Sequence, residues 1–193
     1  IEPHLVALQE VYTFRCHNPF GTEVPLGIDA CELFPNAFNN HLAETVAALG
    51  DEYKVAAVVQ NLTLFPASTL APDWLGLPSG FELPGVPLVL DPTKPPVFIE
   101  VIDRDVILRR EDITTTTVKF GCARVSVEGC NFETVAGASA AGVAFNVERG
   151  FVGVDTTING VDYRFINTHL EVQNPSPDPT SIYFQTMQAS ELL

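Results

Sequence analysis

The sequence predicts an α/β protein of the α+β type, with two packed, mostly antiparallel β-sheets and helices on the outside. Three observations lead to this fold class. Residues 97–169 form a succession of Val- and Ile-rich segments, several with polar side chains at alternate positions, as strands have. Asn159-Gly160 separates two of these segments and is the strongest short-range signal for a hairpin of antiparallel strands. Only two segments, 41–50 and 181–193, have a helical pattern, so we expect few helices, packed outside the sheets.

The first third of the chain alternates between strand and helix. LVALQ (5–9) is a short apolar run of the buried-strand type. HLAETVAALG (41–50) has its apolar side chains on one helical face and ends in Gly50, a typical C-cap. YKVAAVVQNLTLF (53–65) then predicts a strand, whereas residues 15–40 are rich in Pro, Asn and Gly and predict a loop.

Residues 66–96 predict a long Pro-rich loop within the domain. They hold more than half of the chain's 15 prolines and few charged residues. Proline has no N–H to offer to a sheet ladder, so an irregular segment is expected here. Loops of this length are usually functional, but a flap that covers a sheet edge is an equal alternative.

Composition and charge restrict the classes of function. A chain of 193 residues, 46% hydrophobic and 18% charged, is expected to form a single globular domain, residues 1–193. The sequence has no transmembrane segment, because no apolar run approaches the ~18 residues needed to span a bilayer. The net charge of −14 disfavours nucleic acid as a partner, since a uniformly acidic surface repels phosphate backbones.

The four cysteines form two pairs that are close in sequence, Cys16 with Cys31 and Cys122 with Cys130. Sequence alone allows three disulfide pairings, and zinc ligation or free buried thiols are the alternatives. The second pair brackets an alternating run that resembles a hairpin clipped by a disulfide. We expect two disulfides and therefore a secreted or periplasmic protein.

Two polar residues stand at the ends of predicted buried strands. Glu10 follows LVALQ, and His169 ends RFINTH (164–169). A buried charge needs a partner or a metal. Taken singly, each residue has an ordinary structural explanation, a salt bridge for the glutamate and a backbone hydrogen bond for the histidine.

Taken together, LQEV (8–11) and NTHLE (167–171) resemble motifs of the endonuclease/exonuclease/phosphatase superfamily. Three further stretches agree in order with that superfamily. They are RDVILRR (104–110), ERGFVGVDTTINGVDYRFINTHLE (148–171) and QASELL (188–193). The resemblance implies a deoxyribonuclease-I-like sandwich of two β-sheets.

The resemblance also implies roles for five residues. Glu10 matches the carboxylate that holds a divalent cation, Mg²⁺ or alternatively Mn²⁺ or Ca²⁺, and hard cations of this kind prefer oxygen ligands. His169 matches the catalytic histidine, with Asp103 as the acid that orients its ring and favours the imidazolium. Arg149 and Asn167 match positions near the substrate phosphate. The planar guanidinium of Arg149 suits that ligand, and Asn167 is expected to shape the pocket floor.

The sequence also departs from the superfamily pattern. That pattern has an Asn before the Gln-Glu motif, and a Gly-Asp-x-Asn motif and an Asp-His pair after Asn-Thr-His-Leu. This sequence contains neither Gly-Asp-x-Asn nor Asp-His. We therefore expect an incomplete domain that lacks the first strand and the C-terminal part, with an open sheet edge that favours self-association or a complementing fragment.

The function expected from the resemblance is metal-dependent hydrolysis of phosphoesters in the full-length parent, with the 193 residues alone inactive. The acidic charge favours a phospholipid headgroup or a small phosphoester over nucleic acid as substrate. The alternative is a non-catalytic, secreted binding or surface module on the same fold, with 66–96 as its contact surface. A third reading is a disulfide-linked β-sandwich in which the two motifs are coincidental.

Overall fold

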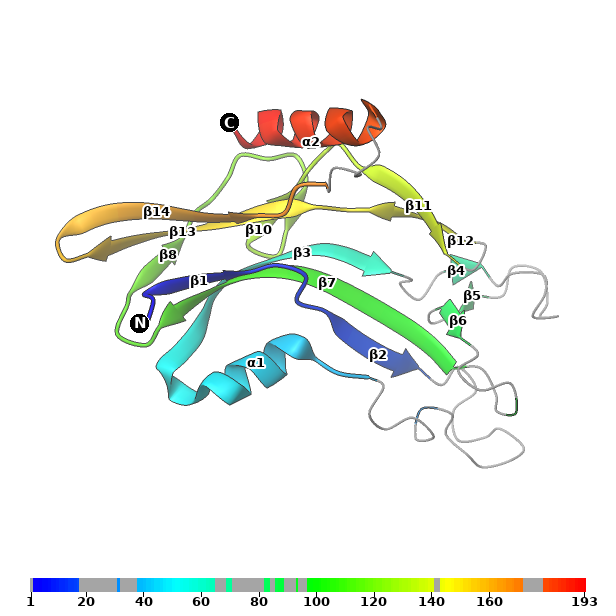
Figure 1. The fold of residues 1–193 in the computed structure, drawn as a ribbon, viewed down its shortest axis with the longest axis horizontal. Helices are drawn as coiled ribbons and strands as arrows, with labels where there is room; N and C mark the ends of the chain where they lie inside the picture. The colour runs from blue at the N-terminus through cyan, green and yellow to red at the C-terminus, as the bar shows by residue number, and fades with distance from the viewer. Residues whose placement is uncertain are drawn as a thin grey trace.

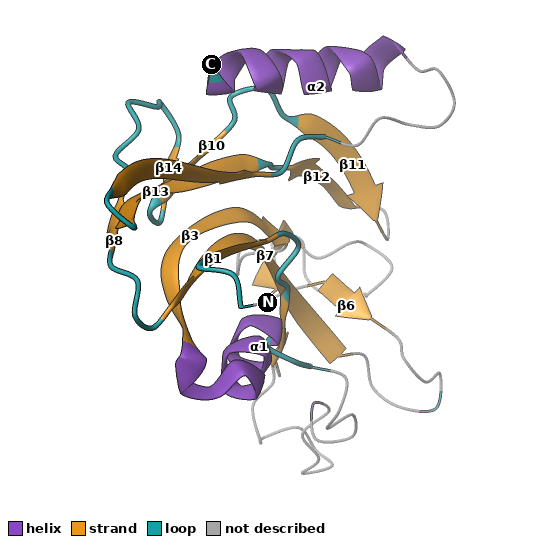
Figure 2. Cartoon of the chain, turned by 60° about the vertical axis from the view of Figure 1, so that its left-hand side comes forward, coloured by secondary structure: helices purple, strands orange, loops and turns teal. Residues whose placement is uncertain are grey.

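The computed structural model shows two antiparallel β-sheets packed face to face, with one α-helix outside each (Figures 1 and 2). Each sheet has five strands, and two short two-stranded ribbons accompany them. The predicted arrangement of two antiparallel sheets with few, outer helices is confirmed in this coarse form. The residues that the structure describes are 2–17, 31, 38–64, 69–70, 82–83, 86–88, 93, 97–140, 143–171 and 179–193.

The first sheet is organised around one long strand, β7 (Val97–Arg110). Four strands pair antiparallel with it: β1 (Leu5–Leu8), β2 (Thr13–His17), β3 (Tyr53–Leu64) and β6 (Val86–Leu88). Because β7 is 14 residues long, it has room for two successive partners along one side. Val106 and Leu108 on one face of β7 pack with α1 (His41–Leu49), and Ile107 on the other face packs against the second sheet.

The second sheet is organised around β13 (Gly150–Ile158), which pairs with β14 (Val161–Thr168) on one side. On its other side lie β10 (Gly129–Asn131), which continues to β9 (Val125–Ser126), and β8 (Thr115–Thr117). The Asn159-Gly160 hairpin is confirmed, and both turn residues have positive φ, 52° and 78°, as a type I′ turn requires. A separate ribbon pairs β11 (Ala136–Ala140) with β12 (Val143–Val147).

Two loop predictions were partly wrong. Residues 15–17 belong to β2, because the long β7 offers them a partner. Within 66–96 the structure forms β6 and the short ribbon of β4 (Thr69–Leu70) and β5 (Glu82–Leu83). Proline is tolerated on edge strands, which explains how Pro87 pairs opposite Phe98. Apart from residue 93, the rest of 66–96 lies outside the described residues.

The two helices and both disulfides agree with expectation. Asn40 caps the start of α1 by accepting a hydrogen bond from the Ala43 amide, and Gly50 ends it with a φ of 63° before a single 3₁₀ turn, η3 (Gly50–Glu52). Helix α2 (Pro179–Leu192) covers the aromatic cluster of β10 and β13. Disulfides join Cys16 to Cys31 and Cys122 to Cys130, the latter clipping the β9–β10 hairpin as predicted. Within the described residues, no helix is long and apolar enough to span a membrane.

Candidate active site

The fold brings four of the five residues expected at the site into one cluster. Arg149, the residue before β13, has its Nη1 3.1 Å from His169 Nδ1, 3.4 Å from Asp103 Oδ2 and 3.9 Å from Glu10 Oε1. His169 Nε2 lies 3.8 Å from Glu10 Oε1. Residues from both sheets, up to 159 positions apart in sequence, therefore meet around one guanidinium group.

Glu10 reaches the cluster because the chain bulges between β1 and β2. Leu8 pairs with Val106 and Thr13 pairs with Ile102, so four residues, 9–12, stand opposite three, 103–105. Glu10 absorbs the extra residue with a φ of 55°, in the left-handed region that non-glycine residues rarely adopt. This bulge leaves the Glu10 side chain 50% exposed, at the mouth of the cluster, although it follows a buried strand.

His169 is the nearest neighbour of Arg149. Because the Arg149 guanidinium donates to Nδ1, the neutral imidazole carries its proton on Nε2, which faces Glu10. Burial lowers the pKa of His169 and the positive charge of Arg149 lowers it further, against the opposing effect of Glu10 and Glu171. We expected an imidazolium held by a carboxylate. In the structure Arg149 instead donates to the inner ring nitrogen, Nδ1, and its charge favours a neutral ring.

Two acids of β7, Asp103 and Asp105, lie at the cluster, whereas the sequence indicated only Asp103. Asp103 pairs with Arg149, whereas the carboxylate nearest to the His169 ring is Asp105, whose Oδ1 lies 3.7 Å from Nδ1. Asp105 is fully buried, accepts from Asn61 Nδ2 at 2.8 Å and accepts from the Glu10 amide at 3.3 Å. It was not among the residues expected from the sequence, although residues two apart on a strand share a face.

The side-chain amide of Asn167 forms hydrogen bonds within the protein. Its Nδ2 donates to the backbone oxygens of Leu8, at 2.8 Å, and Val106, at 3.1 Å. These bonds join β14 of the second sheet to β1 and β7 of the first. Both hydrogen bonds of Asn167 Nδ2 are therefore made within the protein, and its predicted roles at the pocket floor and near a phosphate stay predictions.

Tyr12 is a further member of the cluster that the sequence did not reveal. Burial raises its pKa to about 12, and the negative charges of Asp103 and Glu10 raise it further, against the opposing charge of Arg149. Its place follows from the same bulge, since Tyr12 is the last bulged residue before β2.

Several buried polar atoms around Arg149 have no hydrogen-bond partner among the described residues. They are Arg149 Nε, Asp103 Oδ1, Asn61 Oδ1 and Asn131 Oδ1. Unsatisfied buried groups are uncommon in folded proteins and concentrate where water or a ligand binds. These four atoms lie near one arginine and offer one donor and three acceptors to a bound water or ligand.

The donors only partly fit a divalent cation. Within the described part of the chain, no group of three or more His, Cys, Asp or Glu side chains is arranged to hold a metal. Mg²⁺, however, is commonly held by one or two carboxylates together with waters and substrate phosphate. Glu10, half exposed, and the unpartnered Oδ1 of Asp103 fit that mode of binding.

The two buried acids give the protein a specific pH dependence. Burial raises the pKa of Asp103 and of Asp105 from 3.8 to about 6. The folded state therefore binds protons more tightly than the unfolded state between about pH 4 and 6, so this contribution to stability falls as the pH rises through that window. A shift of this size corresponds to a loss of about 3 kcal/mol for each acid, and because the two acids interact the total belongs to the pair.

This pH dependence can be measured by urea unfolding at intervals between pH 4 and 7. Because other acids have the opposite dependence, the test is the difference between wild type and Asp103→Asn. The variant should gain stability relative to wild type as the pH rises. Asp51→Asn, at an exposed site, should show no such gain. If the stability of both variants relative to wild type changed equally with pH, Asp103 would not be the buried acid responsible.

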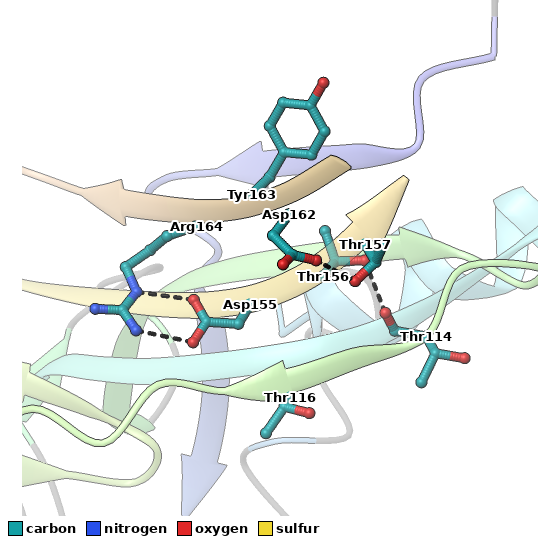
Figure 3. A pocket seen from close by; sticks show the side chains of 8 residues that line it. All are labelled: Thr114, Thr116, Asp155, Thr156, Thr157, Asp162, Tyr163 and Arg164. Atoms are coloured by element: carbon teal, nitrogen blue, oxygen red, sulfur yellow. Dashed lines mark hydrogen bonds and ion pairs between the residues drawn. The ribbon is translucent and has the colours of Figure 1, made fainter. Parts of the chain in front are cut away.

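Two hollows of the described surface lie away from this cluster. A hollow of about 690 Å³ lies near the tip of the β13–β14 hairpin, lined by threonines and by the Asp155–Arg164 ion pair (Figure 3). Another, of about 490 Å³, lies between β1 and the same hairpin. We define the candidate active site by the convergence of its charged side chains.

No family model, curated protein or solved structure matches this chain. The interpretation of the cluster therefore rests on its geometry and on the sequence motifs that meet in it.

Proposed function

We propose that the cluster is the cation- and phosphate-binding part of a metal-dependent phosphoesterase site, on a deoxyribonuclease-I-like sandwich of the endonuclease/exonuclease/phosphatase superfamily. The observation that carries the proposal is the meeting of Glu10 and His169 at 3.8 Å. The two motifs that suggested the superfamily are 159 positions apart (169 − 10) and lie on different sheets. Two unrelated motifs would have no reason to converge on one arginine.

Each residue of the cluster suits one task in phosphoester hydrolysis. Arg149 supplies a guanidinium for the phosphoryl oxygens, which accumulate negative charge in the transition state. The Nε2–H of neutral His169 faces the mouth and is placed to donate to the same group. Asp105 accepts a hydrogen bond from the Glu10 backbone amide and lies beside the His169 ring, so it fixes the position of one residue relative to the other.

A divalent cation, Mg²⁺ or a similar ion, would be held by Glu10, with Asp103 as the second available carboxylate. Such a cation neutralises phosphoryl charge and lowers the pKa of a bound water. The acidic chain favours a phospholipid headgroup or a small phosphoester over nucleic acid as substrate, and its two disulfides fit a secreted protein.

The first experiment measures cation binding. We expect Mn²⁺, titrated calorimetrically or followed by electron paramagnetic resonance, to bind wild type, and Glu10→Gln to weaken binding at least about tenfold because a neutral amide is a poor ligand for a hard cation. Glu44→Gln, an exposed helix position, is the matched control and should bind as wild type does. Equal affinity in all three proteins would argue against Glu10 as the ligand.

The second measurement is hydrolysis of sphingomyelin, inositol phosphates and plasmid DNA with Mg²⁺ and with EDTA. We expect little turnover from the 193 residues, because the sequence lacks the Gly-Asp-x-Asn and Asp-His motifs that orient water and contact phosphate in the superfamily. A longer product of the same gene that carries those motifs should hydrolyse a phosphoester, and EDTA should abolish this activity. EDTA-resistant turnover would contradict the proposal.

The alternative is a non-catalytic binding module on the same fold. It is favoured by one observation, that Arg149 approaches both Glu10 and Asp103, where its charge would compete with a cation. That module would bind inorganic phosphate through Arg149 but would not bind Mn²⁺. The calorimetric titrations distinguish the two functions directly.

A further inference from the structure

Strand β14 is an exposed sheet edge. Among the described residues it pairs only with β13, along its whole length from Val161 to Thr168. Its first four residues are exposed, including the apolar side chains of Val161 and Tyr163, each 51% exposed. Edge strands of this length usually carry a proline, a bulge or a run of lysines that blocks pairing, and the sequence VDYRFINT carries none of these.

The hairpin geometry tells which backbone groups point outward. In a two-residue hairpin the closing pair, here Ile158 and Val161, exchanges its hydrogen bonds within the hairpin, and pairs then alternate along the ladder. Asp162 and Arg164 therefore belong to the non-hydrogen-bonded pairs, and their N–H and C=O groups face the open edge. Their side chains agree with this, because each contacts the residue opposite, as non-hydrogen-bonded pairs do.

A second copy of β14 can meet this edge in only a few antiparallel registers. Residues whose N–H and C=O groups point outward must stand opposite each other in the two copies. The twofold axis must therefore pass between two copies of the same residue, and not between two neighbouring residues. An axis through Asp162 sets two aspartates face to face, and an axis through Arg164 sets two arginines face to face. An axis through Tyr163 places Asp162 of each copy opposite Arg164 of the other, which is attractive twice.

The same register also matches the apolar side chains. With the axis through Tyr163, Val161 of one copy stands opposite Phe165 of the other, and the two Tyr163 side chains meet on the axis. Figure 3 shows that Tyr163 points to one face of β14 while Asp162 and Arg164 point to the other, so the apolar and charged pairs occupy separate faces.

From this self-complementarity we infer that β14 is the homodimerisation edge of the chain, pairing antiparallel with β14 of a second copy about an axis through Tyr163. The five-stranded second sheet then continues across the dimer as one sheet. The charged side chains are already oriented, since Asp155 holds Arg164 through two hydrogen bonds of 2.8 Å and Thr157 holds Asp162 at 2.6 Å. This inference is independent of the proposed phosphoesterase activity.

Two effects limit the strength of the dimer. Each chain carries a net charge of −14, so two copies repel at long range, although physiological salt screens charges beyond about 8 Å. A single strand pair also buries less surface than the usual stable interface. We therefore expect a weak dimer, with a dissociation constant of ~10–100 μM, that forms more readily at about 0.15 M salt than at low salt.

The decisive experiment is a charge exchange, read by analytical ultracentrifugation over a concentration series. Asp162→Lys alone should be monomeric, because the new lysine faces Arg164 of the other copy. Arg164→Glu alone should also be monomeric, because the new glutamate faces Asp162. A mixture of the two variants should form a heterodimer, because both cross-pairs are then of opposite charge. Thermal unfolding of each variant checks that it folds.

Hydrogen exchange of the wild type provides a test that needs no variant. The amides of Asp162 and Arg164 should become protected as the protein concentration rises through the expected dissociation constant. The amides of Val161 and Tyr163 already bond to β13 and should not change. A wild type that stays monomeric at several hundred micromolar would overturn the inference. So would a dimer that persists in both single variants, or a mixture that fails to associate although both variants fold.

Discussion

Gly150→Ala is expected to destabilise the protein by at least about 3 kcal/mol, which corresponds to a fall in melting temperature of about 6–12 °C for a chain of this size. A Cβ at this position would stand 2.4 Å from the backbone oxygen of Cys130 and 2.9 Å from the side-chain oxygens of Asn131 and Asn61. The nearest of these atoms is backbone in a paired strand, so it has little freedom to move away. The strain lies directly beside Arg149.

The matched control is Gly137→Ala, because Gly137 also lies in a strand but has no atom within 4 Å of the position of an added Cβ. The free energies of unfolding of the two variants, measured by heat and by urea, should differ by nearly the full loss expected for Gly150→Ala. A folded Gly150→Ala variant should also show a changed environment of His169 by NMR, because the His169 amide donates to the Gly150 oxygen. Equal stability of the two variants would contradict the close packing of β13 against β3 and β10.

Arg149→Met should be the most damaging change within the site itself. The arginine side chain is 10% exposed and provides the ion pair of Asp103, which is 2% exposed. Removing one partner of a buried pair leaves an uncompensated charge and typically costs 3–5 kcal/mol. Because the pKa of Asp103 is already raised to about 6, the carboxyl can escape by protonation at low pH. We expect a loss of about 3 kcal/mol at pH 8 and a smaller loss at pH 5.

The double variant Arg149→Met/Asp103→Asn separates charge from packing. If the loss comes from the uncompensated carboxylate, the second substitution should restore most of the stability at pH 8. The pKa of His169, followed by NMR, should rise in Arg149→Met, because the guanidinium that lowers it is gone. A loss of stability that is the same at pH 5 and pH 8, and that Asp103→Asn does not relieve, would assign the effect to lost packing.

Local sequence patterns determined the elements whose information lies within a few residues. The Asn159-Gly160 turn can adopt positive φ at both positions, so the β13–β14 hairpin follows from the two residues themselves. Helix α1 follows from its spacing of apolar residues and its cap at Gly50. The clip between Cys122 and Cys130 follows from the alternating run that they enclose.

Strands that depend on a distant partner were harder to predict. The residues of β2 and β6 carry weak strand signals of their own, since one segment adjoins a Pro- and Asn-rich region and the other contains Pro87. They are strands because β7 is long enough to pair with them. The physical reason is that a ladder needs hydrogen-bond partners, which a local pattern does not contain.

The candidate site divides in the same way. Glu10, Arg149 and His169 were indicated by motifs, and the structure brings them together, although their chemical roles stay predictions until cation and phosphate binding are measured. The tertiary structure alone decided four other features. They are the bulge that exposes Glu10, the place of Tyr12 within reach of the charges of Glu10 and Asp103, the approach of Arg149 to the inner nitrogen of His169, and the central place of Asp105. Each depends on how two sheets and an extra residue fit together, because the distance between charged groups is a property of packing and not of sequence spacing.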